Sequence, residues 1–318
     1  MNLINNFDET QSAVGIVSHD AGGAEVLSSY VAQHELRCKF VLEGPALKIF
    51  ERKLGSVPIT SLADAISHCD SLLCGTSWQS DLEWRAIGLA KAVGKCTTAF
   101  LDHWGNYRER FVRQGVQNLP DTIWVGDKAA EGLARSTFPE TAIQLVPNPY
   151  FEDIRVALSK LEHTVQPGVK LGLRVLFVCE PVSEHALKEH GDERHWGYTE
   201  FDALHYFFAN RDVLGKPLAA LVIRPHPSEE KGKYDKISNE FGGVASAGGG
   251  QTLLQEIVES DVVVGCASMA MVIALIVGRR VICAIPPGGR TCGLPQPEIE
   301  SLQILQRNAN SSIDKNVS

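Results

Sequence analysis

Two octapeptides carry the clearest architectural signal in this chain: DSLLCGTS at residues 70–77 and DVVVGCAS at residues 261–268. Each places a serine seven residues after an aspartate, across a short apolar run. A helical stretch follows each octapeptide, ends at a glycine and a basic residue, and leads into another apolar run. Apolar runs without polar alternation are typical of strands covered on both faces. We therefore expect two similar β-α-β units, although any two such units share some likeness.

Runs of the same kind alternate with amphipathic helical stretches along the rest of the chain. Strands are predicted at residues 14–18, 39–42, 71–74, 97–101, 122–125, 143–146, 174–178, 218–223, 243–247, 262–265 and 281–285. Strands separated by helices of this length indicate parallel, doubly wound sheets of the α/β class. A polar stretch at 160–172 is the best candidate for a linker. We expect a Rossmann-like domain over residues 1–160, a second over 170–307 and a tail over 308–318, with the two sheets facing a central cleft.

Composition narrows the class of protein. The chain has 318 residues, 44% of them apolar and 21% charged, which suits a globular protein of about two domains. Its formal charge is −8 and neither half is basic, so bulk electrostatics does not favour nucleic acid as a partner. The longest apolar stretch, residues 269–277, is too short to cross a bilayer. We expect a cytoplasmic protein without an integral membrane segment; its oligomeric state is left open.

The eight cysteines include no C-x-x-C pair, and most lie inside apolar runs. A cysteine in such a run behaves as a small hydrophobic residue. The polar N-terminal residues show no secretory signal, so a disulfide framework is not expected.

The first predicted strand leads into His-Asp-Ala-Gly-Gly at residues 19–23. Neither a P-loop nor G-x-G-x-x-G is present, but Gly22 and Gly23 allow a ligand to approach the backbone closely. Ligands bind beyond the carboxyl ends of parallel strands, where a helix N-terminus offers N–H groups to an anion or a sugar oxygen. We expect a ligand role for this turn. The alternative is that Asp20 caps the helix and the glycines shape the turn.

Residues 101–111, LDHWGNYRERF, form the densest polar and aromatic cluster and also follow a strand. Asp102 and His103, beside aromatic side chains and two arginines, are candidates for a general base and for anion contacts. The alternative is that the aromatic residues pack a domain edge.

In the second half, the strand ending at residue 223 leads into Arg-Pro-His-Pro-Ser. The two prolines restrict the backbone, so Arg224, His226 and Ser228 would be held in a rigid turn suited to a phosphate. A structural role for the histidine is the alternative. Downstream, Thr252 and a glutamine three residues later predict a capping box. Ser268 opens a further helix N-terminus and could donate a hydrogen bond to a phosphate.

Acidic and histidine residues at 184–195 suggest a metal site, but histidines spaced by five do not share a helical face. A solvated loop is the preferred interpretation, and no metal is expected. Glu180 directly follows a predicted strand and is better placed to contact a ligand.

Taken together, these residues in the second half resemble the donor domain of GT-B glycosyltransferases. The shared pattern is RPHP, a glycine-rich turn, L-L-x-E-x-x-x-S-D-x-x-x-G-x-x-S and G-x-x-V-I. The His-Pro element with a downstream serine looks most like bacterial sialyltransferases, capsule Kdo transferases and CDP-glycerol polymerases. The resemblance implies that His226 and Ser268 contact the nucleotide phosphate from opposite loops and that Arg224 assists. It places Asp20, with His103 as a second candidate, where a base activates the acceptor.

The leading functional prediction is a sugar-nucleotide-dependent glycosyl or glycerophosphate transferase of bacterial surface-polysaccharide synthesis. Its partners would be a nucleotide-activated sugar donor and a saccharide acceptor, and it would need no obligatory metal or other cofactor. The first alternative is a hydrolysing nucleotide-sugar 2-epimerase or related hydrolase of the same fold, using residues such as Asp20, Asp102, His103 and Glu180. The second alternative is a degenerate module that binds nucleotide without turnover.

Overall fold

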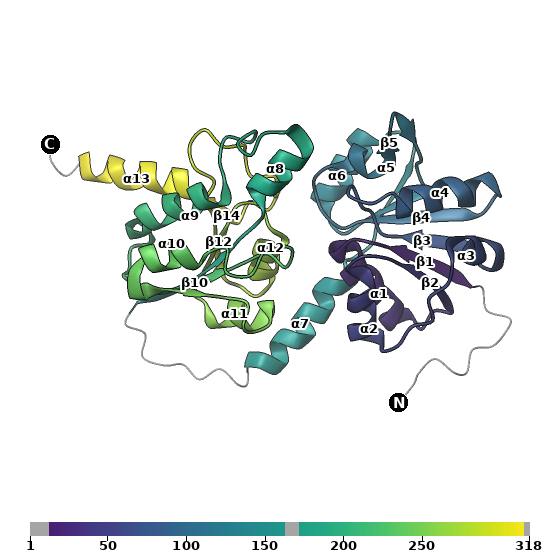
Figure 1. The fold of residues 1–318 in the computed structure, drawn as a ribbon, viewed down its shortest axis with the longest axis horizontal. Coiled ribbons are helices and arrows are strands. Elements are labelled where there is room, and N and C mark those ends of the chain that lie inside the picture. The colour runs from purple at the N-terminus through teal and green to yellow at the C-terminus, as the bar shows by residue number, and fades with distance from the viewer. Residues whose placement is uncertain (1–12, 163–171, 315–318) are drawn as a thin grey trace. The chain divides into compact units, whose positions relative to one another are not determined.

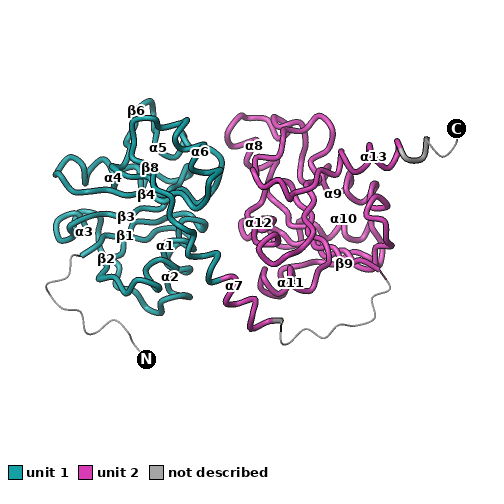
Figure 2. The backbone as a smooth tube through the Cα atoms, turned by 180° about the vertical axis from the view of Figure 1, so that it is seen from behind, with its two compact units in different colours: residues 1–153 teal, residues 154–318 magenta. Residues whose placement is uncertain are grey.

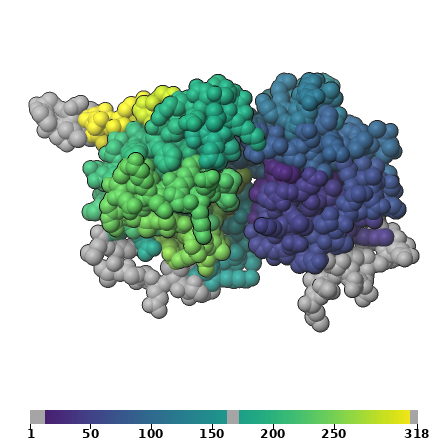
Figure 3. All heavy atoms as spheres, viewed as in Figure 1, coloured from purple at the N-terminus to yellow at the C-terminus, as the bar shows by residue number. Residues whose placement is uncertain are grey.

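The apolar runs form the strands of two separate sheets, one in each half of the chain (Figure 1). The structure, a computed structural model, describes residues 13–162 and 172–314. The chain divides into two units, residues 1–153 and 154–318 (Figure 2). Each unit holds a six-stranded sheet whose strands are all parallel, which confirms the predicted α/β class. Helices flank each sheet, and side chains close over it (Figures 1 and 3).

The sheet of the first unit has the strand order β2-β1-β3-β4-β7-β8. Its strands are β1 (Val14–Ser18), β2 (Cys38–Leu42), β3 (Ser71–Cys74), β4 (Cys96–Leu101), β7 (Thr122–Val125) and β8 (Ala142–Leu145). Its helices are α1 (Ala21–His34), α2 (Ala46–Leu54), α3 (Leu62–His68), α4 (Leu82–Ala92), α5 (Tyr107–Phe111), α6 (Lys128–Thr137) and α7 (Pro149–Glu162), the last of which runs across the division between the units. A short hairpin, β5 (Val112–Arg113) with β6 (Val116–Gln117), follows α5.

The sheet of the second unit has the order β11-β10-β9-β12-β13-β14. Its strands are β9 (Leu173–Val178), β10 (Leu218–Arg224), β11 (Ala245–Ala247), β12 (Val262–Gly265), β13 (Arg280–Cys283) and β14 (Ile299–Ser301). Its α-helices are α8 (Val182–His190), α9 (Glu200–Ala209), α10 (Asp235–Glu240), α11 (Leu253–Glu259), α12 (Met269–Ile276) and α13 (Leu302–Asp314), and the short 3₁₀ turns are η1 (Arg211–Leu214) and η2 (Gly242–Val244).

The two octapeptides occupy the same place in the two sheets. Asp70 precedes β3, and its carboxylate accepts a hydrogen bond from the Ala13 N–H at 3.0 Å, just before β1. Asp261 precedes β12, and its carboxylate accepts one from the Arg174 N–H at 2.9 Å, in β9. Each aspartate thus links the amino end of the strand that follows it to the amino end of the neighbouring strand through one hydrogen bond.

In each sheet the chain changes direction next to that fastened pair. The first unit continues from β1 to β2 on one side and later to β3 on the other, and the second unit does the same with β9, β10 and β12. Loops at the carboxyl ends of such a pair diverge, which leaves a crevice where ligands of doubly wound sheets bind. The predicted site residues of each half therefore belong to the correct edge of its sheet.

Two predictions about loops are wrong. Residues 184–195 were expected to form a solvated loop, but α8 runs through His190, because Val182 and Ala186 are buried one helical turn apart and Gly191 ends the helix at φ 74°. The tail expected at 308–318 is helical as far as Asp314, and the remaining residues lie outside the described part of the chain. Among the described residues, no helix has both the length and the apolar character that a bilayer crossing requires.

Candidate functional site

The turn after β1 presents Asp20 without the capping bond that the alternative interpretation required. Asp20 occupies the N-cap position of α1, yet its side chain caps no backbone N–H. Instead, its Oδ1 atom lies 2.7 Å from Nδ1 of His19, and both side chains are about one quarter exposed. A carboxylate only accepts hydrogen bonds, so the His19 Nδ1–H donates to it and orients it. Asp20 is therefore held as an acceptor of hydrogen bonds at the carboxyl edge of the sheet.

Glu83 of α4 lies beneath this turn and was not selected from the sequence. It is only 2% exposed, and its Oε1 atom accepts a hydrogen bond from the His19 N–H at 2.7 Å. Its Oε2 atom has no partner among the described residues. Burial raises the pKa of Glu83 to about 7. The available signal was helical periodicity, because Glu83 shares the buried face of α4 with Ala86, Ile87 and Ala90.

The paired glycines of the turn leave little room for a side chain. A Cβ atom on Gly22 would lie 1.9 Å from Oδ2 of Asp102. A Cβ atom on Gly23 would lie 3.2 Å from the Cα atom of Gly75, which follows β3. The structure thus brings Gly22 and the predicted residue Asp102 together. Contact of the glycines with a ligand stays a prediction.

Asp102 is held by an ion pair. Nη1 of Arg110 lies 2.9 Å from its Oδ1 atom, and the two side chains are 7% and 10% exposed. The same nitrogen donates to the carbonyl and hydroxyl oxygens of Thr76, both at 2.7 Å. Asp102 therefore links the loops after β3 and β4, and a general-base role would have to compete with this ion pair.

His103 lines a small, open pocket within the first unit. The pocket is bounded by Phe100, Leu101, Asp102, His103, Trp104, Gly126, Asp127, Ala130, Asn148 and Phe151. One wall is rigid, because the Trp104 indole N–H donates to Asp127 at 2.9 Å and Asp127 also caps α6. The aromatic part of the 101–111 cluster is thus packed, as its alternative interpretation held, while His103 remains beside the pocket.

In the second unit, the turn after β10 fixes the protonation of His226. Its Nδ1 atom accepts a hydrogen bond from the Ser228 N–H at 3.2 Å and lies 2.7 Å from the Ser228 hydroxyl oxygen. A nitrogen that accepts from an N–H carries no proton, so the neutral ring is protonated at Nε2. Burial lowers the pKa of His226, against the opposing effect of Glu229. The ring therefore presents Nε2–H as a neutral hydrogen-bond donor.

Arg224, at the end of β10, already has protein partners. Its Nη1 atom donates to Oε2 of Glu256 at 2.6 Å and to the carbonyl oxygen of Gln251 at 3.1 Å. Glu256 in turn accepts the N–H of Gly249 at 2.6 Å, within the glycine-rich turn. Much of the positive charge of Arg224 is thus used to join two loops, and phosphate contact by this residue stays a prediction.

Glu180 contacts the residue before Ser268, at the change of direction in the second sheet. Oε2 of Glu180, in the turn after β9, accepts the N–H of Ala267 at 2.6 Å. Burial raises the pKa of Glu180, and Arg290 opposes the rise. Ser268 caps α12 by accepting the Ala270 N–H at 3.2 Å, which leaves its hydroxyl proton as a donor. The backbone N–H next to Ser268 is therefore already bonded to a carboxylate of the protein, while phosphate contact by Ser268 stays a prediction.

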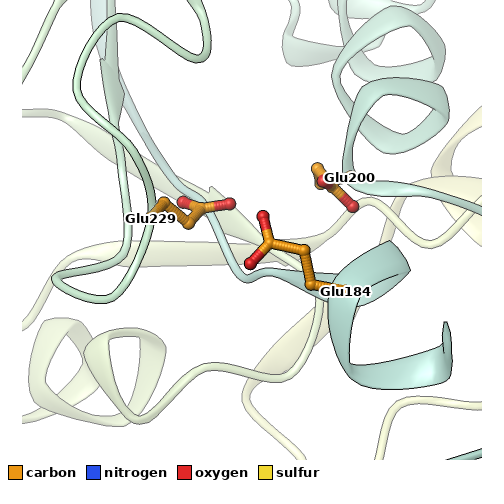
Figure 4. Close-up of side chains that lie close together, drawn as sticks. All are labelled: Glu184, Glu200 and Glu229. Carbon is orange, nitrogen blue, oxygen red and sulfur yellow. The ribbon is translucent and has the colours of Figure 1, made fainter. Parts of the chain in front are cut away.

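A cluster of three glutamates lies beside the turn of His226 (Figure 4). Glu184, Glu200 and Glu229 come from α8, from the start of α9 and from the loop after β10. Within the described residues, they are the one group of possible metal ligands whose atoms all lie within 4.8 Å of one another. Nζ of Lys233 lies 2.7, 2.6 and 2.9 Å from their respective oxygens. The ammonium group thus compensates the carboxylates, and Glu229 also accepts the N–H of His226 at 2.7 Å.

The histidines of the 184–195 segment do not gather into that cluster. The rings of His190 and His195 stack with centroids 3.7 Å apart, and the guanidinium of Arg290 lies 3.8 Å from the ring centroid of Trp196.

The capping box at Thr252 and Gln255 is present with both hydrogen bonds, as predicted.

Comparison with solved structures identifies the class of fold. A protein from Listeria monocytogenes, provisionally assigned as a UDP-N-acetylglucosamine 2-epimerase, is 14% identical with a TM-score of 0.59, covering 96% of this chain and 88% of its own. The UDP-GlcNAc 2-epimerase of Methanocaldococcus jannaschii is 10% identical with a TM-score of 0.53, covering 85% and 83%. No protein-family model matches the sequence, and no curated protein matches it. The two parallel sheets match the two-domain, Rossmann-like architecture of the GT-B fold.

Proposed function

We propose that this protein is a nucleotide-sugar-dependent transferase that moves a glycosyl or glycerophosphate group in bacterial surface-polysaccharide synthesis. The second unit would bind the donor nucleotide, and the first unit would activate the acceptor hydroxyl. The observation that carries the proposal is the position of His226, a ring held through Nδ1 by Ser228 in the turn after β10, which leaves Nε2–H to donate to a ligand. The assignment to surface-polysaccharide synthesis is supported by the sequence resemblance described above.

In this proposal the leaving phosphate is stabilised by hydrogen-bond donors of the protein. His226 would donate Nε2–H to a phosphate oxygen, and Ser268 would donate its hydroxyl proton at the N-terminus of α12. Donors that face the developing negative charge lower the barrier to departure of the nucleotide. Arg224 would assist by adding positive charge near the phosphate, reduced by its ion pair with Glu256. No metal ion is required.

The acceptor would be activated in the first unit. Asp20 would take the proton of the acceptor hydroxyl as that oxygen attacks the transferred group and the bond to the donor phosphate breaks. The Nδ1–H of His19 fixes the carboxylate and stabilises its charge before the transfer. His103, beside the pocket of the first unit, is the second candidate for this base.

Nucleotide binding tests the assignment of His226. A panel of CMP, CDP, UDP and GDP, screened by thermal shift, would first identify the base, since a ligand that binds only the folded state raises its apparent stability. We expect His226→Ala to weaken the affinity for that nucleotide by about tenfold or more, the loss of one hydrogen bond to a charged group. Isothermal titration calorimetry gives the dissociation constants.

The matched control is His205→Ala, which removes an exposed histidine from α9 in the same unit. Its affinity should equal that of the unaltered protein. Equal nucleotide affinity for His226→Ala and His205→Ala would contradict the proposed phosphate contact.

A second candidate function is a hydrolysing nucleotide-sugar 2-epimerase. The observation that favours it is the assignment of both structural relatives named above, although their low identity establishes the fold alone. Incubation with a UDP-sugar and no acceptor separates the two. Epimerised or free sugar would favour the epimerase or hydrolase, turnover that requires an added acceptor would favour the transferase, and binding without any turnover would favour the degenerate module.

A further inference from the structure

Two thiols of the second unit share one hydrogen-bond acceptor. Cys283 is the last residue of β13, and Cys292 lies in the loop that follows. Their sulfur atoms lie 3.2 and 3.3 Å from the same carbonyl oxygen, that of Cys266 in the turn between β12 and α12. Cys283, in a strand, and Cys292, in the loop after it, are thus neighbours at the carboxyl edge of the sheet.

The two cysteines differ in accessibility and in acidity. Cys283 is buried, whereas Cys292 is half-buried between the exposed residues Thr291 and Gly293. Donation from the Cys283 thiol lowers the pKa of Cys292 to about 7, and burial opposes the shift. By contrast, burial raises the pKa of Cys266 well above its usual range. Cys292 is thus the more accessible and the more acidic of the two thiols, and a thiolate is the reactive form of cysteine.

We propose that Cys283 and Cys292 form a redox-active dithiol, which a low-molecular-weight disulfide such as oxidised glutathione converts to an intramolecular disulfide. The Cys292 thiolate attacks one sulfur of the small disulfide, forms a mixed disulfide and releases one thiolate. The Cys283 thiol then loses its proton to solvent, attacks the Cys292 sulfur and expels the second thiolate. Two protein thiols are oxidised, and the small disulfide is reduced to two thiols.

Oxidation would change the turn between β12 and α12. In the reduced protein both sulfur atoms lie within hydrogen-bond distance of the Cys266 carbonyl oxygen. A disulfide carries no proton, so neither sulfur can donate a hydrogen bond to this oxygen once the bond has formed. Ala267 and Ser268 are the next two residues of the chain after Cys266. The proposal of a redox-active dithiol is independent of the proposed function, because its test measures the mass of the protein and not its activity.

The experiment uses the full-length chain with Cys96→Ser, which removes an exposed thiol of the first unit. The protein is incubated with oxidised glutathione, free thiols are alkylated, and the intact and peptide masses are measured without reduction. We expect loss of the mass of two hydrogen atoms and a crosslinked peptide pair containing Cys283 and Cys292. A crosslink between any other pair, or stable glutathione adducts without a crosslink, would overturn the proposal.

Two variants test the order of attack. Cys283→Ser removes the resolving thiol, so the mixed disulfide on Cys292 should accumulate. Cys292→Ser removes the reactive thiol, so neither a mixed disulfide on Cys283 nor a crosslink should form. Circular dichroism establishes that each variant is folded, and Cys283→Ala replaces Cys283→Ser if it is not. Equal glutathione adducts on the two variants would contradict the assigned roles.

Discussion

At the scale of single residues, the ionisation of Glu83 is coupled to the fold of the first unit. Its carboxyl group is buried, one oxygen supports the His19 backbone, and the other has no partner among the described residues. An ionised carboxylate in this position is poorly solvated, which is why its pKa rises from 4.5 to about 7. The charge pattern beneath the Asp20 turn therefore changes within the physiological range of pH.

We predict that Glu83→Gln removes one component of the pH dependence of stability. A raised pKa in the folded state stabilises the protein below the unfolded pKa of 4.5, and this contribution is lost as the pH rises through about 7. Relative to Glu83→Gln, the unaltered protein should therefore lose about 3 kcal/mol of unfolding free energy between pH 4.5 and pH 8. Urea unfolding of both proteins across this range measures the difference. A difference independent of pH would contradict the prediction.

The residues found from sequence and those missed differ in a physical way. Asp20, His226 and Ser268 could be selected as candidates because each comes shortly after an apolar run, where a parallel strand must end. Glu83 was not, because it lies inside a helix and reaches the turn through tertiary packing. The partners of Arg224 and Asp102 were also out of reach, since Glu256 and Arg110 come from other elements.

At the scale of elements, the strands were predicted best. Four of them, β1, β3, β7 and β12, have the predicted bounds, because buried parallel strands are continuous apolar runs. Strand β14 was missed, since its three residues, Ile-Glu-Ser, are too few and too polar to form such a run. Helix α8 was missed because only two of its nine residues are buried. The remaining residues are mostly polar or charged, so the sequence shows no clear helical periodicity of apolar residues.

The aspartates before β3 and β12 give a prediction about these elements. Asp261→Ala removes the acceptor of the Arg174 N–H and should lower the unfolding free energy of the second unit by about 1 kcal/mol, the net value of one hydrogen bond. Asp70→Ala should have a similar effect on the first unit, because its bond to the Ala13 N–H is equivalent. Chemical unfolding, followed for each variant, measures the loss.

The conservative variants are the control for that prediction. Asp70→Asn and Asp261→Asn keep an oxygen that can accept the same hydrogen bond. They should retain most of the stability that the alanine variants lose. If alanine and asparagine are equally destabilising at either position, the hydrogen bond is not the source of the effect.

At the scale of the whole molecule, the sequence contained the α/β class and the division into two halves, since both follow from the order of apolar runs. The comparisons confirm the GT-B type of fold for this chain. The substrate was not readable, because it depends on a few side chains around each carboxyl edge and on the loops that carry them.

The paired aspartates have a consequence for how such a chain can diversify. Each sheet is fastened at its amino edge, by Asp70 in one unit and Asp261 in the other. The residues proposed to do chemistry all lie at the opposite edge, one strand length away. Evolution can therefore exchange the side chains of the active edge while the register of the central strands is maintained elsewhere. The same scaffold can thus acquire a new substrate without having to rebuild the core that supports it.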